Sequence, residues 1–169
     1  SLNNMAVKNY YPELPEIPYK KTTIEMSKVI EYANSLTEYS TEVKRTAYCM
    51  FRNESANGTK GVNGNYAGIQ ADNTRWSGLE GAIATSVRVD SGKAVRRFIC
   101  FDEVDGYKDT FRFLCFKVKQ RGMYIGALGV SNITELTTVY LKKWVGRIDP
   151  IPNKAEIMNW ESLYGSAKK

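Results

Sequence analysis

The sequence contains no histidine. Serine–histidine–aspartate and cysteine–histidine nucleophile systems need an imidazole as their general base, so both systems are excluded. Most zinc sites also use histidine ligands. If the chain is an enzyme, its proton chemistry must therefore come from carboxylates, tyrosines or lysines.

Cysteine is scarce, and only Cys49, Cys100 and Cys115 occur. Their number is odd and no pair has the spacing of metal ligands. Each stands among apolar neighbours, which predicts buried free thiols rather than a disulfide or a reactive site.

Long apolar runs are also absent. No stretch approaches the length of a membrane span, and no basic start followed by an apolar centre marks a signal peptide at Ser1. We therefore expect no membrane span, while a leader removed before Ser1 is compatible with this sequence. The 169 residues fit one domain that can bury a core without disulfides.

The charge balance is basic, with a formal net charge of +6. Such a balance favours a polyanionic partner, which includes nucleic acid, an anionic membrane surface and a cell-wall polymer. The alternative is simply a soluble basic surface. The basic pairs are scattered along the chain and no nucleic-acid motif accompanies them, so we do not expect a nucleic-acid partner.

Proline spacing separates the start of the chain from the rest. Pro12, Pro15 and Pro18 recur every third residue, which favours an extended arm over residues 1–21 that lies along the domain or hangs free. Residues 22–169 are predicted to form a single domain.

Apolar periodicity predicts a mostly helical α+β domain. The first helix should start in a capping box of Thr22 and Glu25 and run to Leu36. A second should follow Ser40 and end at Glu54. Two β-prone runs around "DSGK" in residues 82–101 predict a β-hairpin. Further helices are expected at residues 105–120, 132–144 and 153–164, whereas 55–80 should be an ordered loop region.

Glu54 is a candidate catalytic residue because of its position on the second predicted helix. Val43, Ala47, Met50 and Glu54 step by four, three and four residues, so they share one helical face. A carboxyl group that ends an apolar stripe should lose water, and the helix C-terminus adds negative partial charge. Both effects raise a carboxyl pKa, which suits a general acid. The alternative is a half-exposed charge at a frayed helix end.

The residues after Glu54 are conformationally unusual. Asn57-Gly58, Gly61, Asn63-Gly64 and Asn65 permit left-handed backbone and tight turns. They lead into "YAGIQ", where Gly68 would let the backbone pass close to a ligand or to another segment.

The stretch "ESANGTKGVNGNYAGIQAD" resembles the signature of the lysozyme superfamily, in the branch of peptidoglycan-cleaving glucosaminidases of flagellar and autolysin type and the related lytic transglycosylases. Glu54-Ser55 matches the catalytic Glu-Ser pair of that group. The second segment of the signature is matched by Asn65, Tyr66, Gly68, Ile69 and Gln70. Downstream, "FICFD" resembles the Phe-x-x-Tyr-Asp stretch of the family, with Phe98, Phe101 and Asp102 in its defined positions.

This resemblance implies a lysozyme-like fold with a small β-hairpin lobe, in which Glu54 protonates the glycosidic oxygen. The family places a second carboxylate in the hairpin, but the matching position here falls near Thr85-Ser86 and holds no acid. The nearest candidates for that group are Glu80, Asp90 and Asp72. Three functions stay open: hydrolysis with a shifted carboxylate, a lytic transglycosylase that uses Glu54 alone, or a glycan-binding or assembly domain without catalysis.

The resemblance also implies the partner and its contacts. The expected substrate is the peptidoglycan glycan strand, cut by a monomer of bacterial or phage origin without metal or organic cofactor, in the periplasm or outside the cell. The expected substrate-binding residues are Ser55, Asn65, Tyr66, Ile69, Gln70, Trp76 and Tyr124. For the aromatic residues among them the alternative is a core position, except for Trp76, which stands in a polar stretch.

Overall fold

The computed structural model describes residues 8–72, 81–90 and 93–167. The chain divides into two compact units. The β unit consists of Ser1–Met26 and Glu54–Thr110, and the helical unit consists of Ser27–Asn53 and Phe111–Lys169. The single domain predicted for residues 22–169 stays a prediction.

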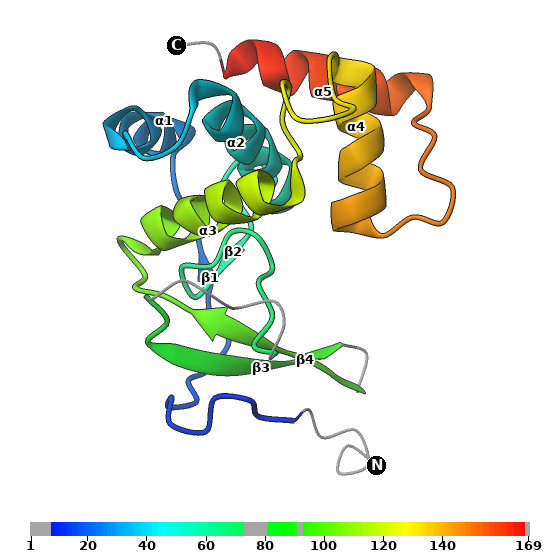
Figure 1. Ribbon diagram of the computed structural model, residues 1–169. Coiled ribbons are helices and arrows are strands. Elements are labelled where there is room, and N and C mark those ends of the chain that lie inside the picture. The colour runs from blue at the N-terminus through cyan, green and yellow to red at the C-terminus, as the bar shows by residue number, and fades with distance from the viewer. Residues whose placement is uncertain (1–7, 73–80, 91–92, 168–169) are drawn as a thin grey trace. The chain divides into compact units, whose positions relative to one another are not determined.

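An antiparallel hairpin is the largest sheet of the β unit (Figure 1). Strand β3 (Ala84–Asp90) pairs with β4 (Lys93–Cys100), from Ala84 opposite Cys100 to Asp90 opposite Lys93. This hairpin confirms the prediction made from the two β-prone runs. The register shifts once, between Arg88 and Val89.

From residue 8 onward, the N-terminal arm lies along the β unit rather than hanging free. The Ile17 amide donates to the Thr85 carbonyl oxygen, and the Thr85 amide donates to that of Pro15, each at 2.8 Å. The arm ends in β1 (Lys21–Thr22), which pairs antiparallel with β2 (Gly61–Val62). The arm is therefore a structural part of this unit.

Helices supply most of the rest of the described chain. They are α1 (Met26–Ser35), α2 (Thr41–Ser55), α3 (Gly106–Arg121), α4 (Ile133–Tyr140) and α5 (Lys154–Ser166), with the π-helix η2 (Leu141–Val145) directly after α4 (Figure 1). The α+β class and the five predicted helical segments are thus confirmed. The boundary between the units crosses α2 after Asn53 and α3 after Thr110.

The predicted capping box is wrong. Thr22 lies in β1, and α1 begins only at Met26. The Thr22 hydroxyl oxygen instead accepts the Gly64 amide at 3.1 Å. The Thr22 hydroxyl group, which the local pattern assigned to capping the first helix, is therefore bonded to a loop that is distant in the sequence.

The core of the helical unit is aliphatic and aromatic. Tyr140 and Trp160 pack with ring centroids 4.9 Å apart, and both side chains are buried. The apolar face predicted for α2 is buried at Val43, Ala47 and Met50. Along the described part of the chain, no helix combines the length and the apolar character that crossing a bilayer requires.

Candidate functional site

Glu54 lies in the last turn of α2, and its side chain is exposed. The prediction that it would lose water by ending a buried stripe is therefore wrong. The buried face passes from Ala47 through Phe51 to Ser55, in steps of four residues, so Ser55 takes the last inward position. Glu54 stands one residue away from that face and projects from the last turn of α2.

Ser55 ends the helix. Its hydroxyl oxygen accepts the Gly58 amide at 2.8 Å, and its carbonyl oxygen accepts the Lys60 amide at 2.9 Å. Ala56 and Asn57 follow with φ angles of 49° and 60°, in the left-handed region. The Ser55 side chain is fully buried, so it fixes the position from which Glu54 projects rather than facing a substrate.

Residues 56–71, called the asparagine loop from here on, are organised around Asn65. The Asn65 side-chain amide donates to the carbonyl oxygens of Ile69 and Ile99 at 3.0 and 2.9 Å. Its side-chain oxygen accepts the amides of Ala67 and Ile69 at 3.1 and 3.2 Å. Asn65 is 2% exposed, so its side chain bonds to protein groups rather than to solvent, and these bonds shape the "NYAGIQ" turn.

Tyr66 and Ile69 are buried as well. The Tyr66 ring fills the space above Gly61, where an added Cβ would come within 2.3 Å of its Cε1 atom. Burial raises the pKa of the Tyr66 hydroxyl, and a hydrogen bond with Thr22 partly opposes this shift. Three of the predicted sugar contacts, Asn65, Tyr66 and Ile69, thus serve the interior of the β unit in this structure.

The end of the asparagine loop extends the hairpin. The Ile99 amide donates to the Ile69 carbonyl oxygen at 3.1 Å, and the Ala71 amide donates to that of Arg97 at 2.7 Å. Gln70 lies between these bonds, bridged to Phe98, and its side chain is half-buried. Gln70 is therefore the predicted contact of this segment that keeps access to solvent.

The two segments that carry the family resemblance meet each other. The Phe101 amide donates to the Asn63 carbonyl oxygen at 2.9 Å. Gly64, at φ 74°, lies so close to the Asp102 carbonyl that an added Cβ would be 2.4 Å from its oxygen. The Asp102 carboxylate in turn accepts the amides of Val104 and Asp105 at 2.9 and 2.8 Å, just before α3. The two motifs thus hold the asparagine loop to the end of β4.

Sequence reasoning missed two residues of this framework. Asn63 is 2% exposed, and its side chain accepts the Lys20 amide and donates to the Pro18 carbonyl oxygen, at 3.2 and 3.1 Å. The Thr110 hydroxyl oxygen, also buried, accepts the Tyr66 amide at 3.2 Å. No local pattern distinguishes Thr110 from any other helical threonine, whereas the Asn63-Gly64 pair signalled only a turn.

The position expected for a second carboxylate holds buried hydroxyl groups. Thr85 and Ser86 are both fully buried in β3. Of the alternative acids, Asp72 is half-buried in the β unit, and its carbonyl oxygen accepts the Tyr11 hydroxyl at 3.1 Å. Glu80 and the side chain of Asp90 lie outside the described residues, as does Trp76.

Tyr124 belongs to the helical unit and not to the β unit that contains Glu54. It follows α3, is half-buried, and offers its carbonyl oxygen to the Ala127 amide at 3.1 Å. Its predicted place beside Glu54 stays a prediction.

The cysteines are buried free thiols, as predicted. Burial raises the pKa of Cys49 to about 12 and also raises those of Cys100 and Cys115, so these thiols are poor nucleophiles. Within residues 8–72, 81–90 and 93–167, no group of three or more histidine, cysteine, aspartate or glutamate side chains is placed to hold a metal ion.

No protein-family model, curated protein or solved structure matches the chain. On the geometry alone, the candidate site is the exposed side chain of Glu54, directly before a loop that buried asparagines hold in a fixed shape.

Proposed function

We propose that this protein cleaves the glycan backbone of peptidoglycan, with Glu54 as the general acid. The observation that carries the proposal is the exposed Glu54 carboxyl group at the last turn of α2, directly before the asparagine loop. Such a site places an exposed carboxyl group beside a backbone held in a fixed shape, and glycosidases need a positioned carboxyl group at the scissile bond.

The chemistry of the chain supports a carboxyl group in this role. There is no histidine to act as acid or base, and the three thiols are buried. Peptidoglycan carries carboxylates on its peptides, so the net charge of +6 would favour its approach.

In the proposed reaction, the Glu54 carboxyl donates its proton to the glycosidic oxygen as the bond to the anomeric carbon breaks. The sugar that retains this carbon becomes oxocarbenium-like, and a negative group nearby stabilises it. In the hydrolytic version a second carboxylate then activates water. Asp72, Glu80 and Asp90 are the candidates for that group, and Gln70 is a candidate for a polar contact to the sugar.

A lytic transglycosylase is the second candidate, favoured by Thr85 and Ser86. Because both hydroxyl groups are buried where the family places its second acid, one carboxyl group would do all the proton transfer. Glu54, once deprotonated, would accept the proton of a hydroxyl group of the same sugar as that oxygen attacks the anomeric carbon. The product would be an anhydro-sugar, and no water would be consumed. A glycan-binding or assembly domain without catalysis is the third alternative.

The test is digestion of purified peptidoglycan by wild type, Glu54→Gln and Glu25→Gln. Glu25 is a matched control, since it is an exposed glutamate of the same unit. We expect Glu54→Gln to lose clearing activity by about a hundredfold or more, because it cannot donate the proton, and Glu25→Gln to keep it. Equal clearing by wild type and Glu54→Gln would remove Glu54 from the mechanism.

Mass spectrometry of the released fragments separates the alternatives. Reducing ends would indicate hydrolysis, and loss of activity in Asp72→Asn would then identify the second carboxylate. Anhydro ends with an active Asp72→Asn would indicate the transglycosylase. Tight binding to peptidoglycan without any release of fragments would leave the binding domain.

A further inference from the structure

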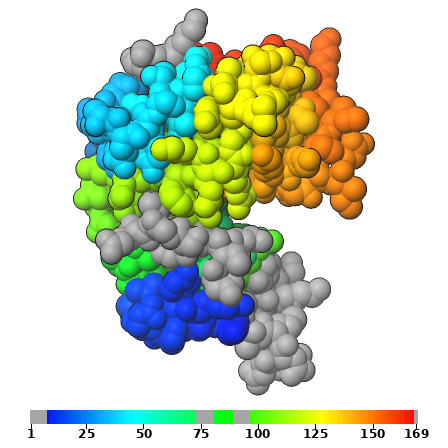
Figure 2. All heavy atoms as spheres, in the orientation of Figure 1, coloured from blue at the N-terminus to red at the C-terminus, as the bar shows by residue number. Residues whose placement is uncertain are grey.

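The segment that joins η2 to α5 exposes large apolar side chains. Within residues 146–153, called the proline loop from here on, Ile148 is fully exposed and Ile151 is 72% exposed. Val145 and Met158, at its two flanks, are also exposed. Figure 2 shows this orange segment on the surface of the helical unit. Isolated exposed apolar residues are ordinary, but several on one short segment indicate a contact surface.

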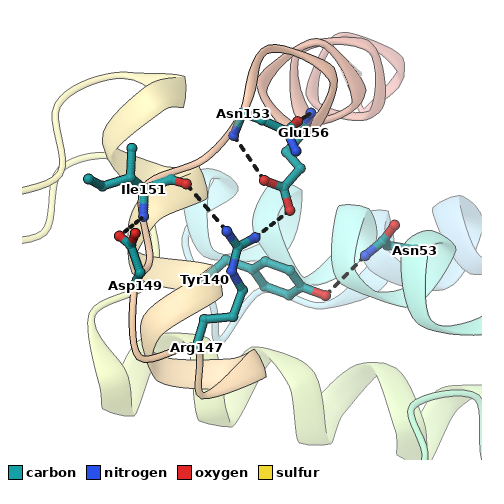
Figure 3. Close-up of polar contacts among 7 residues, drawn as sticks. All are labelled: Asn53, Tyr140, Arg147, Asp149, Ile151, Asn153 and Glu156. Atoms are coloured by element: carbon teal, nitrogen blue, oxygen red, sulfur yellow. Dashed lines mark hydrogen bonds and ion pairs between the residues drawn. The ribbon is translucent and has the colours of Figure 1, made fainter.

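The proline loop is fixed from within. The Arg147 guanidinium donates to a Glu156 carboxylate oxygen at 2.6 Å and to the Ile151 carbonyl oxygen at 3.4 Å (Figure 3). Asn153 and Glu156 form a reciprocal capping box that anchors the other end on α5. In Figure 3 the Ile151 carbonyl faces Arg147, whereas its apolar side chain points the opposite way.

Two prolines stiffen this arrangement further. Pro150 and Pro152 have fixed φ angles and restrict Asp149 and Ile151, the residues before them, to extended backbone. A stiff loop loses little conformational entropy when it binds, so Ile148 and Ile151 are presented for contact at low entropic cost.

The sequence around the two isoleucines is basic. Lys142 and Lys143 precede the proline loop, Lys154 follows it, and all three are exposed. Two carboxylates stand in the same stretch. Asp149 is exposed between the two isoleucines, and Glu156 is bound by Arg147. Residues 142–156 thus carry four basic side chains against two carboxylates.

We propose that the proline loop docks this protein on the surface of an anionic phospholipid bilayer. Ile148 and Ile151 enter the boundary between headgroups and acyl chains, while the flanking lysines contact lipid phosphates. Apolar side chains inserted beside lysines are the pattern by which proteins bind membranes without spanning them. The proposal concerns a partner beyond the glycan substrate and does not depend on catalysis by Glu54.

Charge complementarity favours a bilayer over a protein pocket as the occupant. Lys142 and Lys154, both exposed, flank the apolar tip in the sequence, where basic side chains outnumber carboxylates, and the whole chain is at +6. An anionic bilayer supplies negative charge over its whole face together with an apolar interior, so it satisfies both kinds of group at once.

The test is co-sedimentation of the full chain with sucrose-loaded vesicles. We expect wild type to bind vesicles that contain phosphatidylglycerol and to bind pure phosphatidylcholine vesicles at least about tenfold more weakly. Ile148→Ser combined with Ile151→Ser should weaken binding to the anionic vesicles by about tenfold or more, because it removes the inserted apolar area.

Leu128→Ser is the matched control. Leu128 is as exposed as Ile148 and belongs to the same unit, but it lies in the loop before α4, whereas the proline loop follows η2. We expect it to bind like wild type. Equal weakening by Leu128→Ser would overturn the proposal, because binding would then reflect general surface hydrophobicity.

A charge variant tests the second half of the proposal. Lys142→Ser combined with Lys154→Ser should weaken binding to anionic vesicles by about tenfold and leave the weak binding to neutral vesicles unchanged. Failure of wild type to bind anionic vesicles would overturn the proposal. So would self-association in sedimentation velocity that the double isoleucine variant abolishes, since a second copy would then occupy the tip.

Discussion

The asparagine loop and the proline loop differ in which kind of side chain they bury and which kind they expose. The asparagine loop buries two amide side chains, since Asn63 and Asn65 are each only 2% exposed. The proline loop turns apolar side chains outward, with Ile148 fully exposed. The usual relation between polarity and burial is thus inverted at these residues.

The inversion has a different cause in each loop. The buried Asn65 amide is tolerated because each of its donors and acceptors is paired with a backbone group. In this loop, these side-chain bonds replace the backbone hydrogen bonds that a helix or a sheet would supply. In the proline loop, the polar groups of Arg147 and Asn153 are turned toward α5, so the apolar side chains face solvent. We therefore expect substitutions to affect stability in the first loop and binding in the second.

The largest effect expected from this comparison concerns two glycines with similar backbone. Gly64 has φ 74° and Gly146 has φ 79°. An alanine Cβ at Gly64 would be 2.4 Å from a backbone oxygen, whereas at Gly146 it would meet nothing within 4 Å. Gly64→Ala should lower the free energy of unfolding by about 3 kcal/mol or more, through left-handed strain and displacement of the Asp102 backbone.

Gly146→Ala should cost only the left-handed strain, about 1 kcal/mol. Urea denaturation followed by circular dichroism measures both variants. Equal losses in the free energy of unfolding would show that the left-handed backbone alone destabilises both variants. The backbone around Gly64 and Asp102 would then move apart at little energetic cost.

A smaller effect is expected at two asparagines. Asn65→Ala removes four hydrogen bonds inside the β unit. It should lower the free energy of unfolding by about 2–3 kcal/mol, because buried backbone groups are left without a hydrogen-bond partner. Asn153→Ala removes the side-chain cap of α5, where solvent can replace it, and should cost about 1 kcal/mol.

Aspartate substitutions sharpen the contrast between these positions. Asn153→Asp keeps the capping oxygen at a helix N-terminus and should be nearly neutral or stabilising. Asn65→Asp keeps the acceptors but loses both donors and buries a charge, so it should be at least as harmful as Asn65→Ala. Thermal melting of the four variants would contradict this account if the two positions ranked alike.

Periodic segments could be predicted from the sequence, and the reason is physical. The helices and the hairpin follow from apolar spacing, because each element buries one face whatever its neighbours are. The start of α1 was misplaced because Thr22 bonds to Gly64, far along the chain, and no local pattern records such a bond.

The candidate site was predictable only in part. Residue types after Glu54 correctly indicated left-handed backbone at Asn57, Asn63 and Gly64. Gly61 and Asn65, which the same pattern included, do not adopt it. The residue types did not indicate which asparagines would be buried, since Asn65 depends on the Ile99 carbonyl thirty-four residues away. The exposure of Glu54 was missed for a related reason: the helical wheel resolves a face, but not which of two adjacent residues takes the last inward position before the chain turns.

The smallest effect on stability is expected at the tip of the proline loop. Ile148→Ser combined with Ile151→Ser should change the free energy of unfolding by no more than about 0.5 kcal/mol, because exposed side chains lose little packing when they are replaced. Urea denaturation of this variant beside wild type measures the change. A loss above about 1 kcal/mol would show that these isoleucines pack within the chain in solution, and any loss of vesicle binding could then reflect unfolding. An unchanged stability, together with weakened vesicle binding, would mean that the outward-facing loop is kept for its partner and not for the fold.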